Sequence, residues 1–217
     1  MILHLAERLE IPLRERNALL VAAGYAPVFP ERPLADPALA AARRAVELVL
    51  SGHEPYPALA VDRHWTLVAA NRAVTPLLGD AEPSLLQPPV NVLRLSLHPS
   101  GLAPRIVNLR QWRAHLLARL QHQTEVTADA RLAELLRELR GYPVPDGAEE
   151  DSTEEEYAGI VVPLQLVTDA GTLAFFSTTT VFGTPVDITL SELAIESFFP
   201  ADADTTAVLG RLAGRQI

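Results

Sequence analysis

The 217-residue chain contains no cysteine and no lysine. The absence of cysteine excludes disulfide bonds, thiolate metal sites and cysteine nucleophiles. All 18 basic residues are arginine, and they do not form the clusters that contacts to DNA phosphates require. Together with a net charge of −9, this pattern predicts that the chain as given does not bind specific DNA tightly.

A signal peptide and long apolar runs are also missing. The N-terminus has no basic segment followed by an apolar one. The longest uncharged run, residues 170–186, contains five threonines and alternates in polarity, which is typical of a strand and not of a membrane helix. We therefore expect a soluble, cytoplasmic protein with no membrane partner.

The negative charge is concentrated in one segment. Seven acidic residues lie in residues 146–156, and removing their charges from the net charge of −9 leaves −2. Like charges repel one another, so this segment is expected to be a solvated loop. The functional alternative is a mobile flap over a pocket.

The first residues predict two short helices. Leu5 and Leu9 are four residues apart, and Pro12 suits the first turn of a second helix, which Gly24 can end. Residues 28–35 are expected to be a linker. A third helix should then run from Asp36 to Gly52 and pack either on the following domain or on a second copy of the chain.

The remainder of the chain predicts an α+β domain with a five-stranded antiparallel sheet covered by helices on one face. A helix over residues 107–123 and a second helix, capped by Thr127 and ended by Gly141, should form an antiparallel pair. Asp202 or Asp204 could cap a last helix. The strands are expected at residues 56–61, 65–70, 160–168, 172–182 and 190–199.

Several polar residues have two interpretations. Asn71 is expected to cap the short helix that follows the first hairpin, with a ligand contact as the alternative. Glu192 and Glu196 could be paired carboxylates, but we expect them to protect an exposed sheet edge against aggregation.

The candidates for catalytic or metal-binding side chains are few. His98, His115 and His122 do not have the spacing of a helical zinc site. The sequence also has no HExxH motif, nucleophile elbow or phosphate-binding glycine loop. We therefore expect no enzyme, no metal and no cofactor. A small His-dependent hydrolase is the alternative.

The wording of several segments resembles known families. LAERLEIPLRERNALLVAAGYAP resembles the end of XRE-type helix-turn-helix domains. The order strand, turn, strand, asparagine and helix after residue 55 resembles a PAS domain. Three further blocks resemble the ligand-binding domain of MmyB-like transcription regulators: YPALAVDRHWTLVAANRAV, LSLHPSGLAPRIVNLRQWRAHLLARL and DITLSELAIESFFPADADTTAVLGRL. Regulators of this family join an XRE-type helix-turn-helix to a PAS-like ligand-binding domain.

This resemblance implies the ligand-sensing part of a transcription regulator that binds a small apolar, fatty-acid-like molecule. The domain boundaries would be 1–27 for the end of a helix-turn-helix, 28–52 for a linker and connecting helix, and 53–217 for the PAS-like domain. The DNA-reading helices would lie outside this chain, so DNA would be a partner only of a longer form. A shifted gene start, a fragment and a natural short form all remain open. A dimerisation module without ligand, pairing through the third helix, is the alternative function.

The predicted ligand site combines a helix terminus with apolar side chains. Arg105 and Asn108 lie at the start of the helix over residues 107–123, where they could anchor an acid head group. The tail is expected to contact apolar residues on that helix and on the late strands. The alternative is that Arg105 is an exposed surface charge and that the apolar residues are ordinary core. The proposed tail site contains Trp112, Leu116, Phe175, Phe176 and Leu193.

Overall fold

A computed structural model describes residues 1–144, 162–183 and 185–214. Within these residues the strands form one five-stranded antiparallel sheet in the order β2-β1-β5-β4-β3. The α+β class and the five antiparallel strands are confirmed. The predicted acidic loop lies outside the described residues. The strands are β1 (Ala58–Val61), β2 (Leu67–Ala70), β3 (Leu164–Thr168), β4 (Gly171–Val181) and β5 (Ala194–Pro200).

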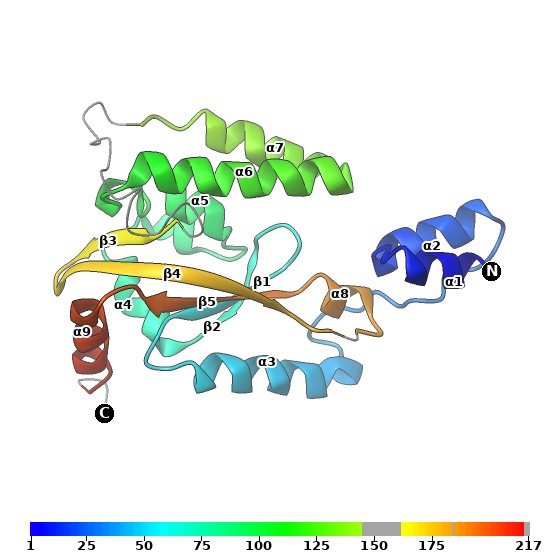
Figure 1. The fold of residues 1–217 in the computed structure, drawn as a ribbon, viewed down its shortest axis with the longest axis horizontal. Coiled ribbons are helices and arrows are strands. Elements are labelled where there is room, and N and C mark those ends of the chain that lie inside the picture. The colour runs from blue at the N-terminus through cyan, green and yellow to red at the C-terminus, as the bar shows by residue number, and fades with distance from the viewer. Residues whose placement is uncertain (145–161, 184, 215–217) are drawn as a thin grey trace.

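Helices lie on both faces of this sheet, whereas the sequence predicted them on one face, because α3 packs on the side opposite α6 and α7 (Figure 1). The longest, α6, packs antiparallel to α7 above one face, and α3 lies along the other. The helices are α1 (Ile2–Arg8), α2 (Leu13–Ala22), α3 (Ala40–Gly52), α4 (Thr75–Leu78), α5 (Val92–Leu97), α6 (Leu109–Thr127), α7 (Ala130–Arg140), α8 (Ile188–Ser191) and α9 (Ala203–Gly214). Single 3-10 turns occur at η1 (Pro37–Leu39), η2 (Arg72–Val74), η3 (Pro83–Leu86) and η4 (Ala103–Arg105).

The main hydrophobic core lies between the sheet and α5, α6 and α7. Leu120 of α6 and Leu139 of α7 are fully buried, as is Leu173 of β4. On the opposite face, Val46 and Leu50 of α3 pack on the sheet in a smaller cluster. The third helix therefore packs on its own domain, which was one of the two predicted possibilities.

The predicted sheet edge at Glu192 and Glu196 is wrong. β5 is the central strand, and the edges are β2 and β3. Glu196 is 4% exposed. Glu192 follows α8 and does not belong to a strand, because the segment predicted as one strand divides into α8 and β5. Alternation of polarity shows which residues share a face, but it does not reveal the order of the strands.

Three predicted helix boundaries have different outcomes. Asp202 does cap α9, since its carboxylate accepts a hydrogen bond from the amide of Thr205 at 2.6 Å. Thr127 does not begin the second helix of the pair: α6 continues to it, the left-handed Ala128 ends α6, and Asp129 caps α7. Asn71 makes no side-chain cap.

The N-terminal helices α1 and α2 form a small separate hairpin beside the domain (Figure 1). Gly24, with φ of 82°, ends this hairpin as predicted. The following linker is held to the domain by a backbone bond from the Ile188 amide to the Pro30 carbonyl at 2.9 Å, and by the hydroxyl of Thr189, which donates to the carbonyl of Arg32 at 2.6 Å. None of the described helices is long and apolar enough to cross a membrane.

Candidate functional site

A mostly apolar cavity of about 430 Å³ lies between the sheet and the helices α4, α5 and α6. Trp112 and Leu116 project into it from α6, because they lie four residues apart on the buried face of that helix. Phe175 of β4 lies on the opposite wall. Such a shape, apolar with a few polar groups, is typical of sites for small apolar ligands.

Most polar side chains at the cavity already have partners within the chain. The amide of Asn71 accepts from Ala58 and donates to the carbonyls of Leu50 and Tyr56, so it joins α3, β1 and the end of β2. The indole of Trp112 donates to the hydroxyl of Ser96 at 3.0 Å. These bonds hold the wall in place.

The wall of the cavity also contains an ion pair whose carboxylate is buried and whose guanidinium is partly exposed. The guanidinium of Arg119, on α6, donates to the carboxylate of Glu196 at 2.9 Å and to the hydroxyl of Thr179 at 3.1 Å. It lies 4.8 Å from the ring centre of Trp65, in cation–π geometry. Arg119, Glu196 and Trp65 also line an outer depression of about 290 Å³, so they form the wall between it and the cavity.

Of the seven predicted ligand-binding residues, Trp112, Leu116 and Phe175 line the cavity, and the others lie elsewhere. Phe176 is on the opposite face of β4 and stacks on Phe199 at 5.2 Å. Leu193 packs in the cluster beneath α3. Ligand binding by these residues stays a prediction.

Arg105 joins two segments of the cavity's frame. Its guanidinium donates to the carbonyls of Leu77 and Leu78 at the end of α4, and to the carbonyl of Val167 in β3. This approach requires Gly79, because a Cβ there would lie 2.1 Å from a guanidinium nitrogen. The described lining residues do not include Arg105, which acts here as a positioning residue.

Asn108 has a comparable structural role at the start of α6. It is 2% exposed. Its amide donates to the carbonyl of Pro163 at 2.7 Å and accepts from the amide of Gln165 at 3.2 Å. It therefore fixes α6 to β3, and it is not among the described residues that line the cavity.

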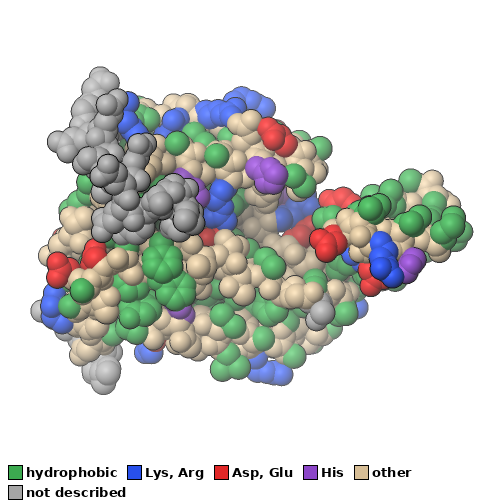
Figure 2. Space-filling model, viewed as in Figure 1, with side chains coloured by type: hydrophobic (Ala, Val, Ile, Leu, Met, Phe, Trp, Pro, Cys, Tyr) green, Lys and Arg blue, Asp and Glu red, His purple; other side chains and the backbone are tan. Residues whose placement is uncertain are grey.

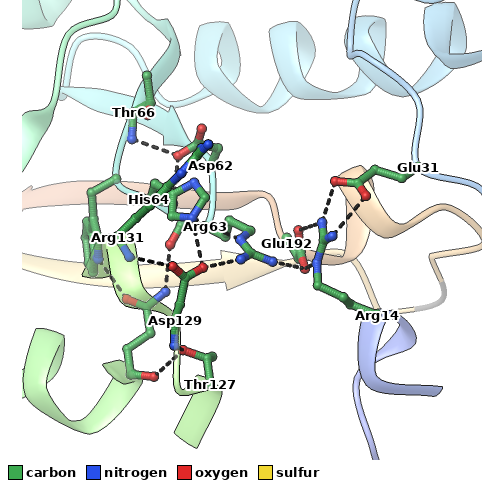
Figure 3. Close-up of polar contacts among 12 residues, drawn as sticks. Arg14, Glu31, Asp62, Arg63, His64, Thr66, Thr127, Asp129, Arg131 and Glu192 are labelled. Carbon is green, nitrogen blue, oxygen red and sulfur yellow. Dashed lines mark hydrogen bonds and ion pairs between the residues drawn. The ribbon is translucent and has the colours of Figure 1, made fainter. Parts of the chain in front are cut away.

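A second site, which we name the polar cluster, lies where the N-terminal hairpin meets the domain. Figure 2 shows acidic and basic side chains gathered at this junction. Figure 3 shows that they form a chain of ion pairs and hydrogen bonds from the N-terminal helices to the α6–α7 turn. Its members are Arg14, Glu31, Arg63, His64, Asp129 and Glu192, which come from separate segments and line a depression of about 410 Å³.

The centre of the polar cluster is the turn between β1 and β2. Arg63 pairs with Asp129, and its guanidinium lies 3.3 Å from Glu192. His64 adds a hydrogen bond to Asp129 at 3.0 Å. Partial burial favours a higher pKa for Asp129, but the bonds from His64, the Arg131 amide and Arg63 outweigh it and lower the pKa to about 2.

Arg14 is the member that belongs to the N-terminal hairpin. Its guanidinium donates to Glu192 at 2.7 Å and to Glu31 at 2.9 Å. The hydrogen bonds that Arg14 donates to Glu192 and then to Glu31 raise the pKa of Arg14 well above its ordinary value. Arg14 thereby joins α2 to the segment between α8 and β5.

Trp65 connects the two sites. Its indole, which lines the cavity, donates to the amide oxygen of Gln123 at 2.8 Å. The amide of Gln123 donates in turn to the carbonyl of Arg63 at 2.8 Å. Trp65 has a φ of 64°, which a tryptophan rarely adopts, so the turn that carries it is tightly held. The sequence could have indicated this position for Trp65, since a large aromatic residue directly follows the polar turn of the first hairpin.

Two of the three histidines considered as catalytic candidates pack on aromatic rings, and the third, His122, lines the outer depression. His115 stacks on Trp112 at 5.7 Å, and burial followed by the charge of Arg119 lowers its pKa. His98 packs edge-on against Tyr142 at 5.0 Å. Within residues 1–144, 162–183 and 185–214, no group of three or more His, Asp or Glu residues could hold a metal ion.

An antiparallel sheet whose covering helices enclose an apolar cavity defines a domain built to accommodate a small ligand. The family model described as MmyB-like transcription regulator ligand binding domain matches residues 42–212. The chain therefore belongs to this family, and its domain is a ligand-sensing domain of a transcription regulator. A search of curated proteins gives no match.

Proposed function

We propose that this chain is the ligand-sensing part of an XRE-type helix-turn-helix transcription regulator, and that its cavity binds a fatty-acid-like molecule with a single apolar chain. The observation that carries the proposal is the cavity of about 430 Å³ with Trp112, Leu116 and Phe175 in its wall. Burying an apolar chain there gains the free energy of removing its surface from water.

The route from ligand to output is the hydrogen-bond path through Trp65. A ligand in the cavity contacts the indole, which is joined through Gln123 to Arg63 in the polar cluster. Arg63 and Arg14 share Glu192, so a shift of the β1–β2 turn changes the hold on α2. Ligand occupancy would thus bias the position of the N-terminal hairpin relative to the sensing domain.

The test is ligand capture by the purified chain. Native mass spectrometry and solvent extraction should detect a co-purified lipid, or binding of added dodecyl compounds. Leu116→Trp fills part of the cavity and should lower the affinity at least about tenfold, equivalent to roughly 1.4 kcal/mol. Leu117→Trp, on the same helix but outside the described lining, is the matched control. Equal binding by both variants would contradict a ligand site in this cavity.

Homodimerisation is a second candidate because α3 presents apolar side chains to solvent. Leu48 is 71% exposed and Val49 is 43% exposed, whereas Val46 faces the sheet. Light scattering at high concentration should give a dimer that Leu48→Glu reduces and that the exposed control Arg44→Glu leaves intact. A monomeric wild-type chain would remove this candidate.

A further inference from the structure

The central strand places a carboxylate against the apolar cavity. Glu196 lies opposite Leu59 of β1 and Thr179 of β4, on the face of the sheet that α6 covers. Its side chain is 6% exposed. A buried carboxylate costs several kcal/mol unless it is paired and hydrogen-bonded, so an apolar residue would be the ordinary choice at this position.

The charge of Glu196 is balanced within the protein. One carboxylate oxygen, Oε1, accepts from Arg119 at 2.9 Å and from the hydroxyl of Thr179 at 2.8 Å. From the part of the chain that the structure describes, the other oxygen, Oε2, receives only a contact of 3.5 Å from Arg119. Oε1 is therefore well satisfied, whereas Oε2 retains capacity to accept a hydrogen bond.

Both cations in the described lining of the cavity already have an acidic partner. Of the described lining residues, only Arg72, Arg119 and Glu196 carry a charge. Arg72 is paired with Glu54 at 2.8 Å, and its side chain is 78% exposed. Arg119 is neutralised by Glu196. An ionised carboxylate in the cavity would therefore face a carboxylate and find its cations already paired.

We infer that the cavity selects a chain whose polar end is uncharged and donates a hydrogen bond, such as a primary alcohol or an amide, with Glu196 Oε2 as the acceptor. This inference rests on the proposed function, because it concerns the same cavity, and it narrows the fatty-acid-like ligand to a single apolar chain without an ionised carboxylate. An alcohol supplies the donor that Oε2 lacks, and a hydrogen bond to a charged acceptor is among the stronger ones in proteins. Glu196 is thus a specificity-determining residue, and Arg119 holds it in place.

The position of the pair adds a consequence for signalling. Arg119, Glu196 and Trp65 form the wall shared with the outer depression, which Arg63 and Glu192 also line. A polar end bound at Glu196 therefore lies beside Trp65 and close to the polar cluster. A chain without that polar end fills the cavity but does not engage this wall.

The experiment compares probes that share one chain and differ only at the polar end. Dodecan-1-ol, methyl dodecanoate and dodecanoate are titrated at pH 8, where the free acid is ionised, by isothermal calorimetry or by displacement of a fluorescent probe. The alcohol should bind at least about tenfold more tightly than dodecanoate, since it gains a charge-assisted hydrogen bond and avoids repulsion. The ester, which cannot donate, should lie between them.

Glu196→Gln tests the role of the carboxylate. The change keeps the shape but leaves Arg119 without its anion, so dodecanoate should gain about tenfold relative to dodecan-1-ol. Glu138→Gln, which removes an acidic partner of Arg94 outside the cavity lining, should leave the ratio unchanged. Circular dichroism and thermal unfolding check that both variants fold. If Glu196→Gln does not fold, the comparison of the three probes on the wild-type chain tests the inference by itself.

The outcomes separate this inference from the proposed function. Tighter binding of dodecanoate than of dodecan-1-ol to the wild-type chain overturns the uncharged polar end and leaves the ligand site intact. An unchanged ratio in folded Glu196→Gln overturns the role of Glu196. If no dodecyl compound binds, the lipid-like ligand of the proposed function fails, and the inference fails with it.

Discussion

The cavity and the polar cluster have nearly the same volume, about 430 and 410 Å³, but opposite chemistry. The cavity is built from apolar side chains of neighbouring strands and helices, with one ion pair in its wall. The polar cluster is built from charged side chains of remote segments. Apolar packing tolerates different ligands of similar shape, whereas a chain of ion pairs depends on the position of every member.

This difference suggests that the two regions have different roles. The apolar side chains around the cavity belong to the main core and stabilise the domain, whereas the polar cluster supplies a contact that a small movement can break. Trp65 lies at the boundary and belongs to both through its ring and its indole nitrogen. The following predictions test whether the two regions are separable.

Truncating the cavity wall should have the largest effect on stability. Phe175→Ala removes a side chain that is 1% exposed, and the free energy of unfolding should fall by about 3–5 kcal/mol. Phe176→Ala, at the next position of β4 but on the other face and half-buried, should cost less. Urea denaturation measures the free energy of unfolding of both variants. An equal loss in the two would contradict the prediction that the cavity face of β4 contributes more to stability than the other face.

Breaking the polar cluster should have a smaller and more local effect. Arg63→Met keeps the apolar stem but leaves Asp129 and Glu192 without this partner. Hydrogen exchange of the α2 amides should accelerate about tenfold, equivalent to roughly 1.4 kcal/mol, while α6 and α7 should change less. Arg94→Met, which breaks a pair with Glu138 far from α2, is the control. Unchanged exchange in α2 would show that the cluster does not hold the hairpin.

The smallest effect should be the pH-dependent contribution of Asp129. Its pKa is about 2 in the folded chain and 3.8 in the unfolded chain, so its charge stabilises the fold above pH 3.8. That contribution, about 1 kcal/mol after allowance for solvent screening, is lost as the pH falls toward 2.

Asp129→Asn isolates this charge because asparagine also caps a helix. The variant should be less stable than the wild type at pH 7 and nearly equal to it at pH 2, as measured by urea unfolding at each pH. A stability difference that does not change with pH would show that the ionised carboxylate has no part in the effect.

Much of the fold follows from local pattern. The helical spacing of Trp112 and Leu116 predicted that the two residues share a buried face, because a periodic apolar face has to be buried. The alternation in β4 indicated that Phe175 and Phe176 lie on opposite faces, but it did not reveal which of these faces lines the cavity. Helix ends with a strong local cause, such as Asp202 and Gly24, were also predictable. In these cases neighbours in sequence determine the structure.

The remaining features depend on contacts between distant segments. Arg105 has a long side chain, and its destination depends on where α4 and β3 lie. The burial of Glu196 follows from β5 being central, which no local pattern reveals. The polar cluster joins residues as far apart as Arg14 and Glu192, and single charged residues in loops carry no periodic signal.

The central place of β5 also has a consequence for how the protein is made. β1 pairs with β5 on one side and β4 pairs with it on the other, yet β5 follows all the other strands along the chain. During synthesis, the β1–β2 hairpin and the β3–β4 hairpin cannot join into one sheet until β5, which pairs with both, leaves the ribosome. Their facing edges are then exposed to other chains, so the interval before β5 emerges is when this protein most needs protection from aggregation.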